Sequence, residues 1–234
     1  MKAISFNLSG KFAHFKKPDV NSNVYFTYSH IHKIALLGIF GAILGLDGYN
    51  KDIKDYPEFY KKLKYLKVSI IPKEVIFSKK IITFNNSVGY ASKEQGGNLV
   101  VKEQWLENPS WEILVKDDGS DEFNKLREKL FNKECVYIPY LGKNDHFANI
   151  SDIKEIELKK ATKPMVCKSL IPKSKIKSLK QPMFGRVYFY EEYLPIGMKE
   201  KFLMYEMDKM VLSSGIVDSD EMWEYEGRGV YFNK

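Results

Sequence analysis

The sequence predicts an α+β protein, because apolar residues recur at two different periods along its 234 residues. They alternate with polar residues in segments such as 2–8 and 110–115, which is typical of strands with one buried face. They recur at helical spacing over 29–46 and about 120–132. After residue 150 only short strand patterns remain. A hydrophobic content of 44% is enough for a core.

The first predicted strand, residues 2–8, leads through a polar loop to a helix over 29–46. In the strand, Ile4, Phe6 and Leu8 alternate with polar residues. Ser29 is the expected N-cap of the helix, and Gly48 follows its end. Glycine is unfavourable inside a helix, so we expect the glycines at 38, 41 and 45 to allow close packing against another element.

The middle of the chain predicts a short helix or turn over residues 55–66 and then four strand patterns: VSIIP, EVIFSKKIITF, NLVVKEQWL and SWEILV. The second and third form a hairpin at about 80–107, with Gly96 and Gly97 at its tip. A helix over about 120–132, capped by Ser120 or Asp121, and a short strand, CVYIP, complete this part.

The order strand, helix, strand, strand, helix, strand is that of the split βαβ arrangement, the ferredoxin-like fold. RNA-recognition domains share this plan, so the predicted fold is ferredoxin-like (RRM-like) with a hairpin inserted between its middle strands. We expect this domain to occupy residues 1–145 and a smaller β-rich region to occupy 146–234.

Composition narrows the classes of function. The formal net charge of +7 and pI near 9.1 favour a polyanionic partner. The two cysteines, Cys135 and Cys167, indicate neither a disulfide framework nor a zinc site, and they fit a reducing cytoplasm. The longest apolar run, 34–46, is too short to cross a bilayer, so no membrane role is expected. No nucleotide-loop, zinc-protease or hydrolase motif occurs, and no cofactor or metal is expected.

The stretch NLSGKFAHFKKP, residues 7–18, is the first candidate site. It places rings beside cations, a combination that suits single-stranded RNA: Lys11, Phe12, His14, Phe15, Lys16 and Lys17. His30, His32 and Lys33 fall in the first turn of the expected helix, where unpaired N–H groups attract phosphate. In the alternative interpretation, the lysines are solvated and the two phenylalanines belong to the core.

Two further segments have functional and structural interpretations. In LGKNDHFANI, residues 141–150, Lys143 and His146 are candidates for a phosphate or a partner subunit, or the segment is an ordinary connection anchored by Phe147 and Ile150. Residues 159–180 hold eight lysines and no acid, which is more typical of a solvated surface. Residues 191–226 hold ten acids against three lysines.

Metal-independent RNA cleavage needs a general base and a general acid. The formal candidates are His14, His30, His32 and His146, with Tyr28 as an orienting partner. Their spacing fixes no catalytic pair.

The N-terminal 50 residues resemble the start of the CRISPR-associated Cas-five family of the RAMP superfamily, the subunit that caps one end of the Cascade surveillance complex. The resemblance consists of a first strand ending in Gly10, Ala13 and Phe15 after it, Thr27 before the helix, and a glycine-rich helix ending in Gly-Leu. YIPYLGKNDHFANI, residues 137–150, is similar to the family's Tyr-Leu-Gly segment. The sequence looks most like the type I-B form.

The resemblance implies that the ferredoxin-like part is a palm and the hairpin a thumb, and that both grip the 5′ handle of the CRISPR RNA (crRNA). It also implies contacts with the Cascade backbone and large subunits, and with target DNA through the complex. The residues it implicates in RNA binding are Lys11, His14, Lys16, Lys17, Tyr28, His30 and Lys33 from the loop and helix start, and Lys93 and Lys102 from the hairpin. Phe15 of the first candidate segment and Lys143 and His146 of the second complete the set of residues predicted to bind RNA.

Catalysis is the alternative within the same family. In type I-C systems the equivalent subunit cuts precursor RNA with a Tyr and a Lys-His pair. Here every His follows Ala, Ser, Ile or Asp, so the Lys-His pair is absent. We therefore predict a non-catalytic RNA-binding scaffold, with a metal-independent endoribonuclease as the alternative and a free-standing RNA-recognition protein as a third possibility.

Overall fold

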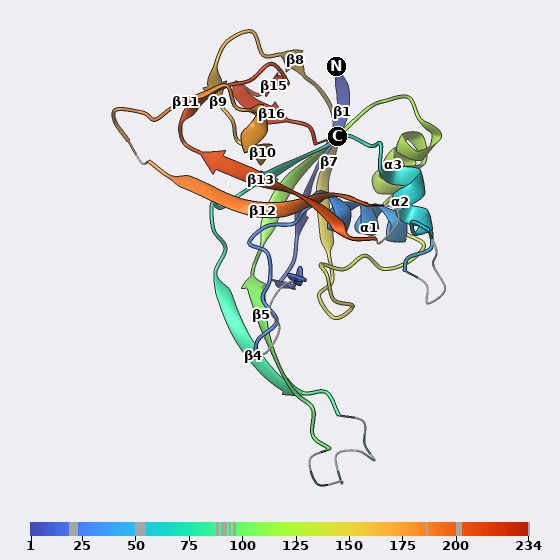
Figure 1. The fold of residues 1–234 in the computed structure, drawn as a ribbon. Coiled ribbons are helices and arrows are strands. Elements are labelled where there is room, and N and C mark those ends of the chain that lie inside the picture. Colours follow the sequence, from blue (N-terminus) through green and yellow to red (C-terminus); the bar gives the residue numbers. More distant parts are fainter. Residues whose placement is uncertain are drawn as a thin grey trace.

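A four-stranded antiparallel sheet with three helices forms the first part of the fold (Figure 1). The computed structural model describes residues 1–18, 23–49, 55–87, 89, 93, 95, 97–185, 187–199 and 203–233. The sheet has the order β3-β6-β1-β7 and consists of β1 (Lys2–Ser9), β3 (Val68–Pro72), β6 (Ser110–Lys116) and β7 (Asn149–Glu157). The helices are α1 (Lys33–Leu44), α2 (Glu58–Leu63) and α3 (Asp121–Asn132).

The sheet is built from two β-α-β units, each of which has a strand of the other unit between its own two strands. The chain passes from β1 through α1 and α2 to β3, and β6 lies between these strands. It then passes from β6 through α3 to β7, and β1 lies between these two. Every neighbouring pair is antiparallel. The predicted α+β class is therefore confirmed.

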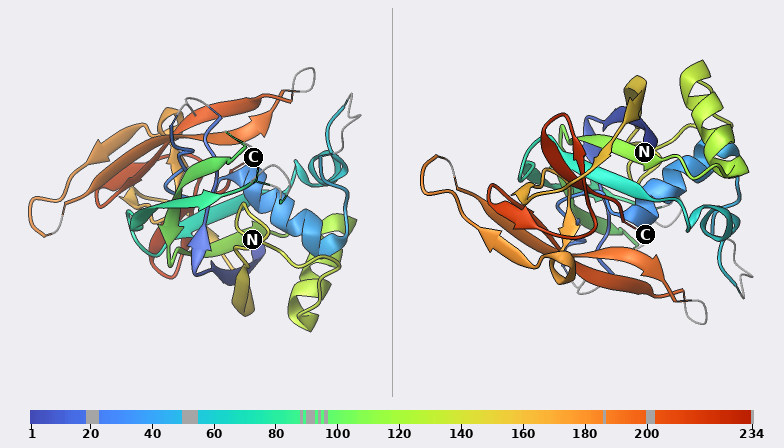
Figure 2. Two further views of the ribbon diagram at one scale, coloured as in Figure 1. Left: turned by 90° about the horizontal axis from the view of Figure 1, so that it is seen from below. Right: turned by 90° about the horizontal axis from the view of Figure 1, so that it is seen from above.

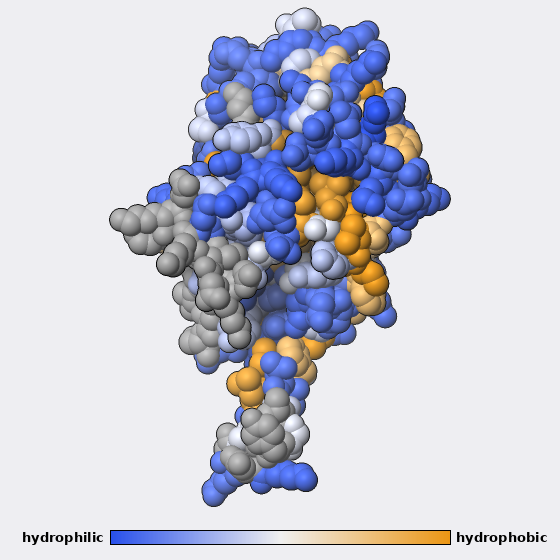
Figure 3. Space-filling view, turned by 90° about the vertical axis from the view of Figure 1, so that its right-hand side faces the viewer, coloured by the Kyte–Doolittle hydropathy of each residue, from blue (hydrophilic) through white to orange (hydrophobic). Residues whose placement is uncertain are grey.

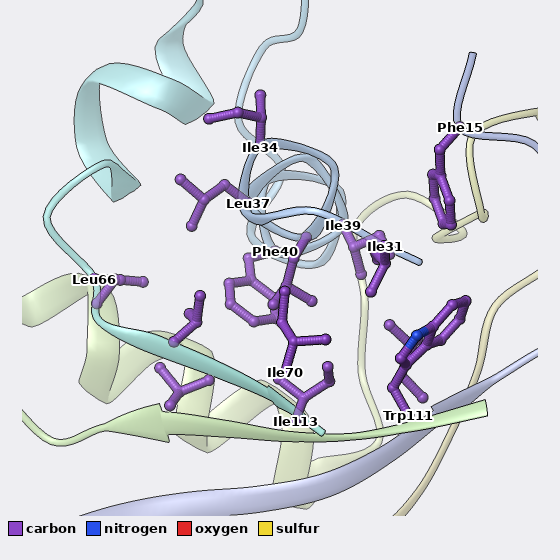
Figure 4. Packing of buried hydrophobic residues seen from close by; sticks show 14 of the residues in the cluster. Phe15, Ile31, Ile34, Leu37, Ile39, Phe40, Leu66, Ile70, Trp111 and Ile113 are labelled. Carbon is purple, nitrogen blue, oxygen red and sulfur yellow. The ribbon is translucent and has the colours of Figure 1, made fainter. Parts of the chain in front are cut away.

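Helix α1 packs against one face of the sheet and forms the centre of the main core. Phe40 points from the helix toward Ile70 and Ile113 of the sheet (Figure 4), and its ring lies 6.2 Å from that of Phe6 on β1. Trp111, at the end of the same core, is fully buried. None of the described helices has the length and apolar character needed to span a membrane.

The ends of α1 differ from the prediction. Ser29 is not the N-cap, because residues 29–32 are not helical; the imidazole Nδ1 of His32 instead accepts a hydrogen bond from the N–H of Ala35 (3.3 Å). The helix ends at Gly45, whose φ of 75° is left-handed, rather than near Gly48. For α3, by contrast, the predicted cap Ser120 is confirmed.

A long hairpin projects from the sheet (Figure 1), as predicted for about residues 80–107. It consists of β4 (Lys79–Asn85) and β5 (Val100–Glu107), and the short β2 (Phe12–Ala13) pairs with the base of β5. Of the two glycines expected at its tip, Gly96 lies outside the described residues.

The strand predicted for CVYIP is wrong, because residues 135–139 are irregular. The N–H groups of Val136 and Tyr137 donate to the carbonyls of Ile43 (3.1 Å) and Ala42 (3.0 Å) at the end of α1 instead of joining a sheet. The fourth strand of the sheet is β7, so the boundary predicted after residue 145 separates this strand from its sheet.

The remaining strands form short sheets and one long ribbon, made by β12 (Phe189–Met198) and β13 (Tyr205–Ser213) (Figure 2). The others are β8 (Lys159–Lys160), β9 (Met165–Val166), β10 (Ile171–Pro172), β11 (Ser178–Lys180), β14 (Ile216–Asp218), β15 (Met222–Tyr225) and β16 (Arg228–Tyr231), with a 3-10 turn at Lys173–Lys175.

The C-terminal region is joined closely to the first sheet. Tyr225, Val230 and Phe232 pack with Ala3 and Leu114 in a second cluster. At the outer edge of β3, Val68 and Asn233 exchange two backbone hydrogen bonds (2.8 and 3.3 Å). The two regions therefore share cores and backbone pairing.

The lysine-rich block, 159–180, pairs with the acidic block, 191–226. Lys175 contacts Glu221 (2.6 Å) and Lys177 contacts Asp220 (2.7 Å). Lys173 contacts Glu191 (3.0 Å). Several charges of the two blocks therefore offset each other, which agrees with the interpretation of 159–180 as a surface.

The glycines of α1 give a matched test of the packing. A Cβ on Gly41 would lie 2.6 Å from Cβ of Phe59, whereas one on Gly38 would meet no atom within 4 Å. We expect Gly38→Ala to raise the free energy of unfolding by up to about 1 kcal/mol. Gly41→Ala should lower it, because overpacking costs about 1–3 kcal/mol. Urea denaturation measures both, and equal stabilisation would contradict the close contact at Gly41.

Candidate nucleic-acid interface

Residues 12–18 and 23–28, after β1, form two extended arms that lie along the base of the hairpin. The two arms are joined by hydrogen bonds from Tyr28 N–H to the Phe15 carbonyl (2.9 Å) and from Lys17 N–H to the Phe26 carbonyl (2.8 Å). Tyr25 then exchanges backbone bonds with β5 (2.9 Å each). The ribbon of these two arms is thus held along β5, and the order of its side chains is set by the alternation of extended backbone.

This alternation gathers rings and cations on one face of the hairpin base, which we call the ring face. Lys16 Nζ lies 3.9 Å from the ring centroid of Tyr25. Lys143 Nζ lies 4.7 Å from that of Phe84 and 5.5 Å from that of Trp105. Cations at such distances are attracted to the ring electrons. The ring face comprises Phe12, Lys16, Tyr25, Phe84, Trp105 and Lys143.

Accessibility differs among these groups. Lys16 is exposed, and the other five residues of the ring face are half-buried. Lys80, paired opposite Trp105, is exposed on the same face. Lys11 is exposed beside Phe12, with its Nζ 5.6 Å from the ring centroid. Rings and cations are therefore presented together, as single-stranded RNA sites require.

The predicted hairpin lysines lie elsewhere. Lys102 is exposed and paired with Thr83, three positions from Trp105, so alternation places it on the opposite face from Lys16 and Lys143. Lys93 is exposed toward the end of the hairpin, beyond both paired strands. The structure therefore does not bring Lys93 and Lys102 into the ring face.

Two predicted histidines meet under the ring face. The imidazole Nδ1 of His14 lies 2.9 Å from the carbonyl of Gln104, and the ring of His146 lies 4.4 Å from that of Trp105. Both side chains are buried, and burial lowers the pKa of each. His14 Nε2 and both nitrogens of His146 have no hydrogen-bond partner among the described residues.

An ion pair closes this junction. Lys143 Nζ lies 2.8 Å from Glu103 Oε2, which also accepts a hydrogen bond from Trp105 Nε1 (2.7 Å). Burial opposes ionisation of Glu103, but the bonds from Lys143 and Trp105 outweigh it and lower the pKa. Lys143 thereby ties its own segment, 141–150, to the hairpin. Neither of the two predicted interpretations of that segment included this contact.

Lys17 fastens the ribbon to the C-terminal region. Its Nζ lies 2.6 Å from Oε1 of Glu192 on β12, and the other carboxylate oxygen accepts hydrogen bonds from Ser29 N–H (2.9 Å) and the Tyr190 hydroxyl (2.5 Å). Burial opposes ionisation of Glu192, yet these bonds together lower its pKa. Lys17 is therefore already paired within the protein.

The predicted anion site at the start of the helix is not on the surface. His30 is buried between the Trp111 indole N–H (3.4 Å) and the Val75 carbonyl (3.0 Å), and burial lowers its pKa to about 4. Lys33 Nζ donates to the Lys64 carbonyl (2.8 Å), and burial lowers its pKa to about 8. His32 caps the helix.

Phe15 and Tyr28 are buried as well. The ring of Phe15 lies 6.0 Å from that of Trp111 in the core (Figure 4). Six of the residues predicted to bind RNA are therefore buried in this structure: His14, Phe15, Tyr28, His30, Lys33 and His146. Tyr25, Lys80, Phe84 and Trp105 were not predicted. The alternation in NVYFTY was the available signal for Tyr25.

No family model and no curated protein matches this sequence. The fold does match solved structures. A chain of a CRISPR RNA-guided surveillance complex is similar with a TM-score of 0.53 at 12% identity, over 92% of this chain and 91% of that chain. A CRISPR protein from Archaeoglobus fulgidus is similar with a TM-score of 0.54 at 12% identity, over the full length of both.

A third similar chain comes from a type III-B Cmr-beta complex bound to cognate target RNA and AMPPnP. Its TM-score is 0.50 at 11% identity, over 93% of this chain and 86% of that chain. All three matched chains come from CRISPR-associated proteins. At these identities the similarity establishes the fold, and the chain therefore has a fold found among CRISPR-associated proteins.

The buried histidine at 30 predicts a dependence of stability on pH. Its folded pKa of about 4 lies below the ordinary value of 6.5, so stability is full above pH 6.5 and falls as the pH drops toward 4. Between pH 7 and 5 this one group should cost roughly 2 kcal/mol. Urea denaturation should show that the free energy of unfolding of His30→Gln falls less over the same pH range. RNA affinity should be unchanged. Weaker RNA binding by a folded variant would contradict an internal role.

Proposed function

We propose that this chain is an RNA-binding subunit of a type I CRISPR surveillance complex and that it holds the 5′ handle of the crRNA. The observation that carries the proposal is the ring face, where exposed Lys16 and half-buried Lys143 lie against half-buried rings at the base of the hairpin. The fold shared with a chain of a CRISPR RNA-guided surveillance complex supports it.

In this proposal the four-stranded sheet with α1, α2 and α3 is a ferredoxin-like palm, and the β4–β5 hairpin is a thumb. The interlocked order β3-β6-β1-β7 supports the first assignment, and the projection of the hairpin from the sheet supports the second (Figure 1). The type I-B form remains part of the proposal, as do contacts with the backbone and large subunits and with target DNA through the complex.

The RNA lies on the ring face in this arrangement. Lys16, Lys80 and Lys11 contact phosphates, and Tyr25 stacks on a base, because its ring is half-exposed next to Lys16. Lys143 and Glu103 fix the base of the thumb. These contacts suit a subunit that holds the constant handle segment of the crRNA, while guide pairing supplies the specificity for target DNA.

A nuclease is a second candidate because His14 and His146 interact electrostatically at the junction. Both side chains are almost fully buried, with exposures of 4% and 3%, so a ribose hydroxyl does not reach them in this arrangement. Incubating the purified chain with precursor repeat RNA in EDTA tests this. No cleavage is expected, and a defined product from this chain alone would contradict the scaffold proposal.

The two faces of the hairpin provide a matched test for phosphate contacts. We expect Lys16→Ala and Lys80→Ala each to weaken binding of a handle RNA and to reduce the slope of log affinity against log salt by about 0.7. Lys102→Ala, on the opposite face, should change both less. Fluorescence anisotropy across a salt series measures this. If Lys102→Ala alone reduced the slope, the RNA would lie on the other face.

Stacking should have a different signature. Tyr25→Ala removes a ring without removing charge, so we expect an affinity loss of about 1–3 kcal/mol with an unchanged salt slope. The control is Tyr65→Ala, which removes a more exposed tyrosine next to Lys64.

A free-standing RNA-recognition protein would bind unrelated single-stranded RNA as tightly as the handle, which would contradict a role specific to CRISPR RNA.

A further inference from the structure

Helix α1 is apolar on all sides, yet the described residues leave one of its sides uncovered. After Lys33, its sequence IALLGIFGAIL contains no polar side chain. Leu36, Phe40 and Ile43 are buried, but Ala35, Gly38 and Ala42 are only half-buried. A helix that is hydrophobic all round is normally buried all round. The uncovered side is therefore a candidate contact surface.

A groove with a volume of about 620 Å³ runs along this side. Its floor is Ala35, Gly38 and Ala42, and one wall contains Tyr137 and Ile138, which are exposed by 56% and 67%. Figure 3, which shows the side of the molecule where the helices lie, displays a band of apolar residues bordered by hydrophilic ones. The groove therefore has the volume of an ordinary binding site, and exposed apolar residues line it, as at surfaces that bind a partner.

The wall of the groove is preformed. Tyr137 N–H donates to the Ala42 carbonyl (3.0 Å) and Val136 N–H to the Ile43 carbonyl (3.1 Å), so the wall is bonded to the last turn of α1. Farther along, the Leu141 carbonyl accepts a hydrogen bond from His14 N–H (3.0 Å). Binding there needs little ordering of the backbone, which lowers its entropic cost.

The charges around the groove favour a protein over RNA. Among the described residues that line it, the charged ones are Lys16, toward the start of α1, and Asp47, beyond its end. A bound RNA strand would need cations along its phosphates. Apart from Tyr205, the lining residues lie in helices and irregular segments, so an added β-strand would have no long edge to pair with.

We propose that this groove binds an amphipathic helix of a protein partner. The floor of small residues lets a second helix approach closely, and Tyr137 and Ile138 flank its apolar side. Since α1 has 12 residues and is about 18 Å long, the docked segment spans about three turns. Its apolar side chains recur at helical spacing, and a lysine and an acid at opposite ends suit Asp47 and Lys16. The proposal does not rest on RNA binding.

The probe for this groove is a phage-displayed library of peptides about 16 residues long, selected on the full-length protein. Enriched peptides should carry apolar residues at positions i, i+3 or i+4, and i+7. A fluorescein-labelled enriched peptide should bind at least tenfold more weakly to Gly38→Leu and to Ile138→Glu. Its affinity should depend little on salt, because the contact is mainly apolar.

The variants separate blocking from unfolding. A side chain at Gly38 meets no atom within 4 Å of its Cβ, and leucine favours the helix, so Gly38→Leu should remain folded while filling the groove. Ile76→Glu is the control for Ile138→Glu, because Ile76 is equally exposed (66%) but lies outside the groove. Handle RNA should bind all of these variants normally.

Three results would overturn the proposal. The first is selection without enrichment of helically spaced apolar residues. The second is an enriched peptide that binds Gly38→Leu as well as the original protein. The third is a loss of RNA affinity, rather than of peptide affinity, in Gly38→Leu, which would assign the groove to RNA. Failure of RNA binding in the original protein would refute the proposed function and leave these measurements unaffected.

Discussion

The packing of α1 against the four-stranded sheet determines where the other features of the molecule lie. The helix brings an almost wholly apolar surface to the sheet, and Phe40 packs against strands from both of its β-α-β units. The ribbon that precedes the helix is consequently drawn to the end of the sheet, where Phe15 contacts Trp111. The segment after α3 is bonded to the last turn of α1. The ring face and the groove therefore meet at Lys16, which belongs to the first and lines the second.

Local patterns in the sequence predicted most of the secondary structure. The strands over 68–72 and 110–116 and the helix capped by Ser120 follow from alternation, helical spacing and a capping residue, all of which involve neighbouring residues. CVYIP has the composition of a strand, but its N–H groups bond to carbonyls of a helix about ninety positions earlier, and no local pattern encodes that. The start of α1 was misplaced for a similar reason: Ser29 is a better N-cap residue than His32, but its N–H is bonded to Glu192 on β12.

The sequence predicted the kind of candidate site, but only some of the residues that form it. The mixture of rings and lysines in 11–17 indicated RNA, and alternation alone places Phe12, His14 and Lys16 on one side of the chain. Which of them remain accessible depends on distant residues: His14 is buried with its imidazole at the Gln104 carbonyl, and Glu192 pairs with Lys17. Burial of a histidine or lysine against such partners cannot be inferred from spacing, because a solvated cation and a buried one have the same sequence signature.

The backbone pairing of Val68 with Asn233 has a consequence for synthesis. β3 is the outer strand of the first sheet, and part of its free edge is covered only when the last residues of the described chain return to it. On the ribosome, the N-terminal half is made long before that residue appears, so a strand edge stays open while translation continues. A nascent chain stalled in the second half would carry this open edge, and with it a greater tendency to pair with other chains, while its α1 core would still lack the residues that β12 and β13 supply.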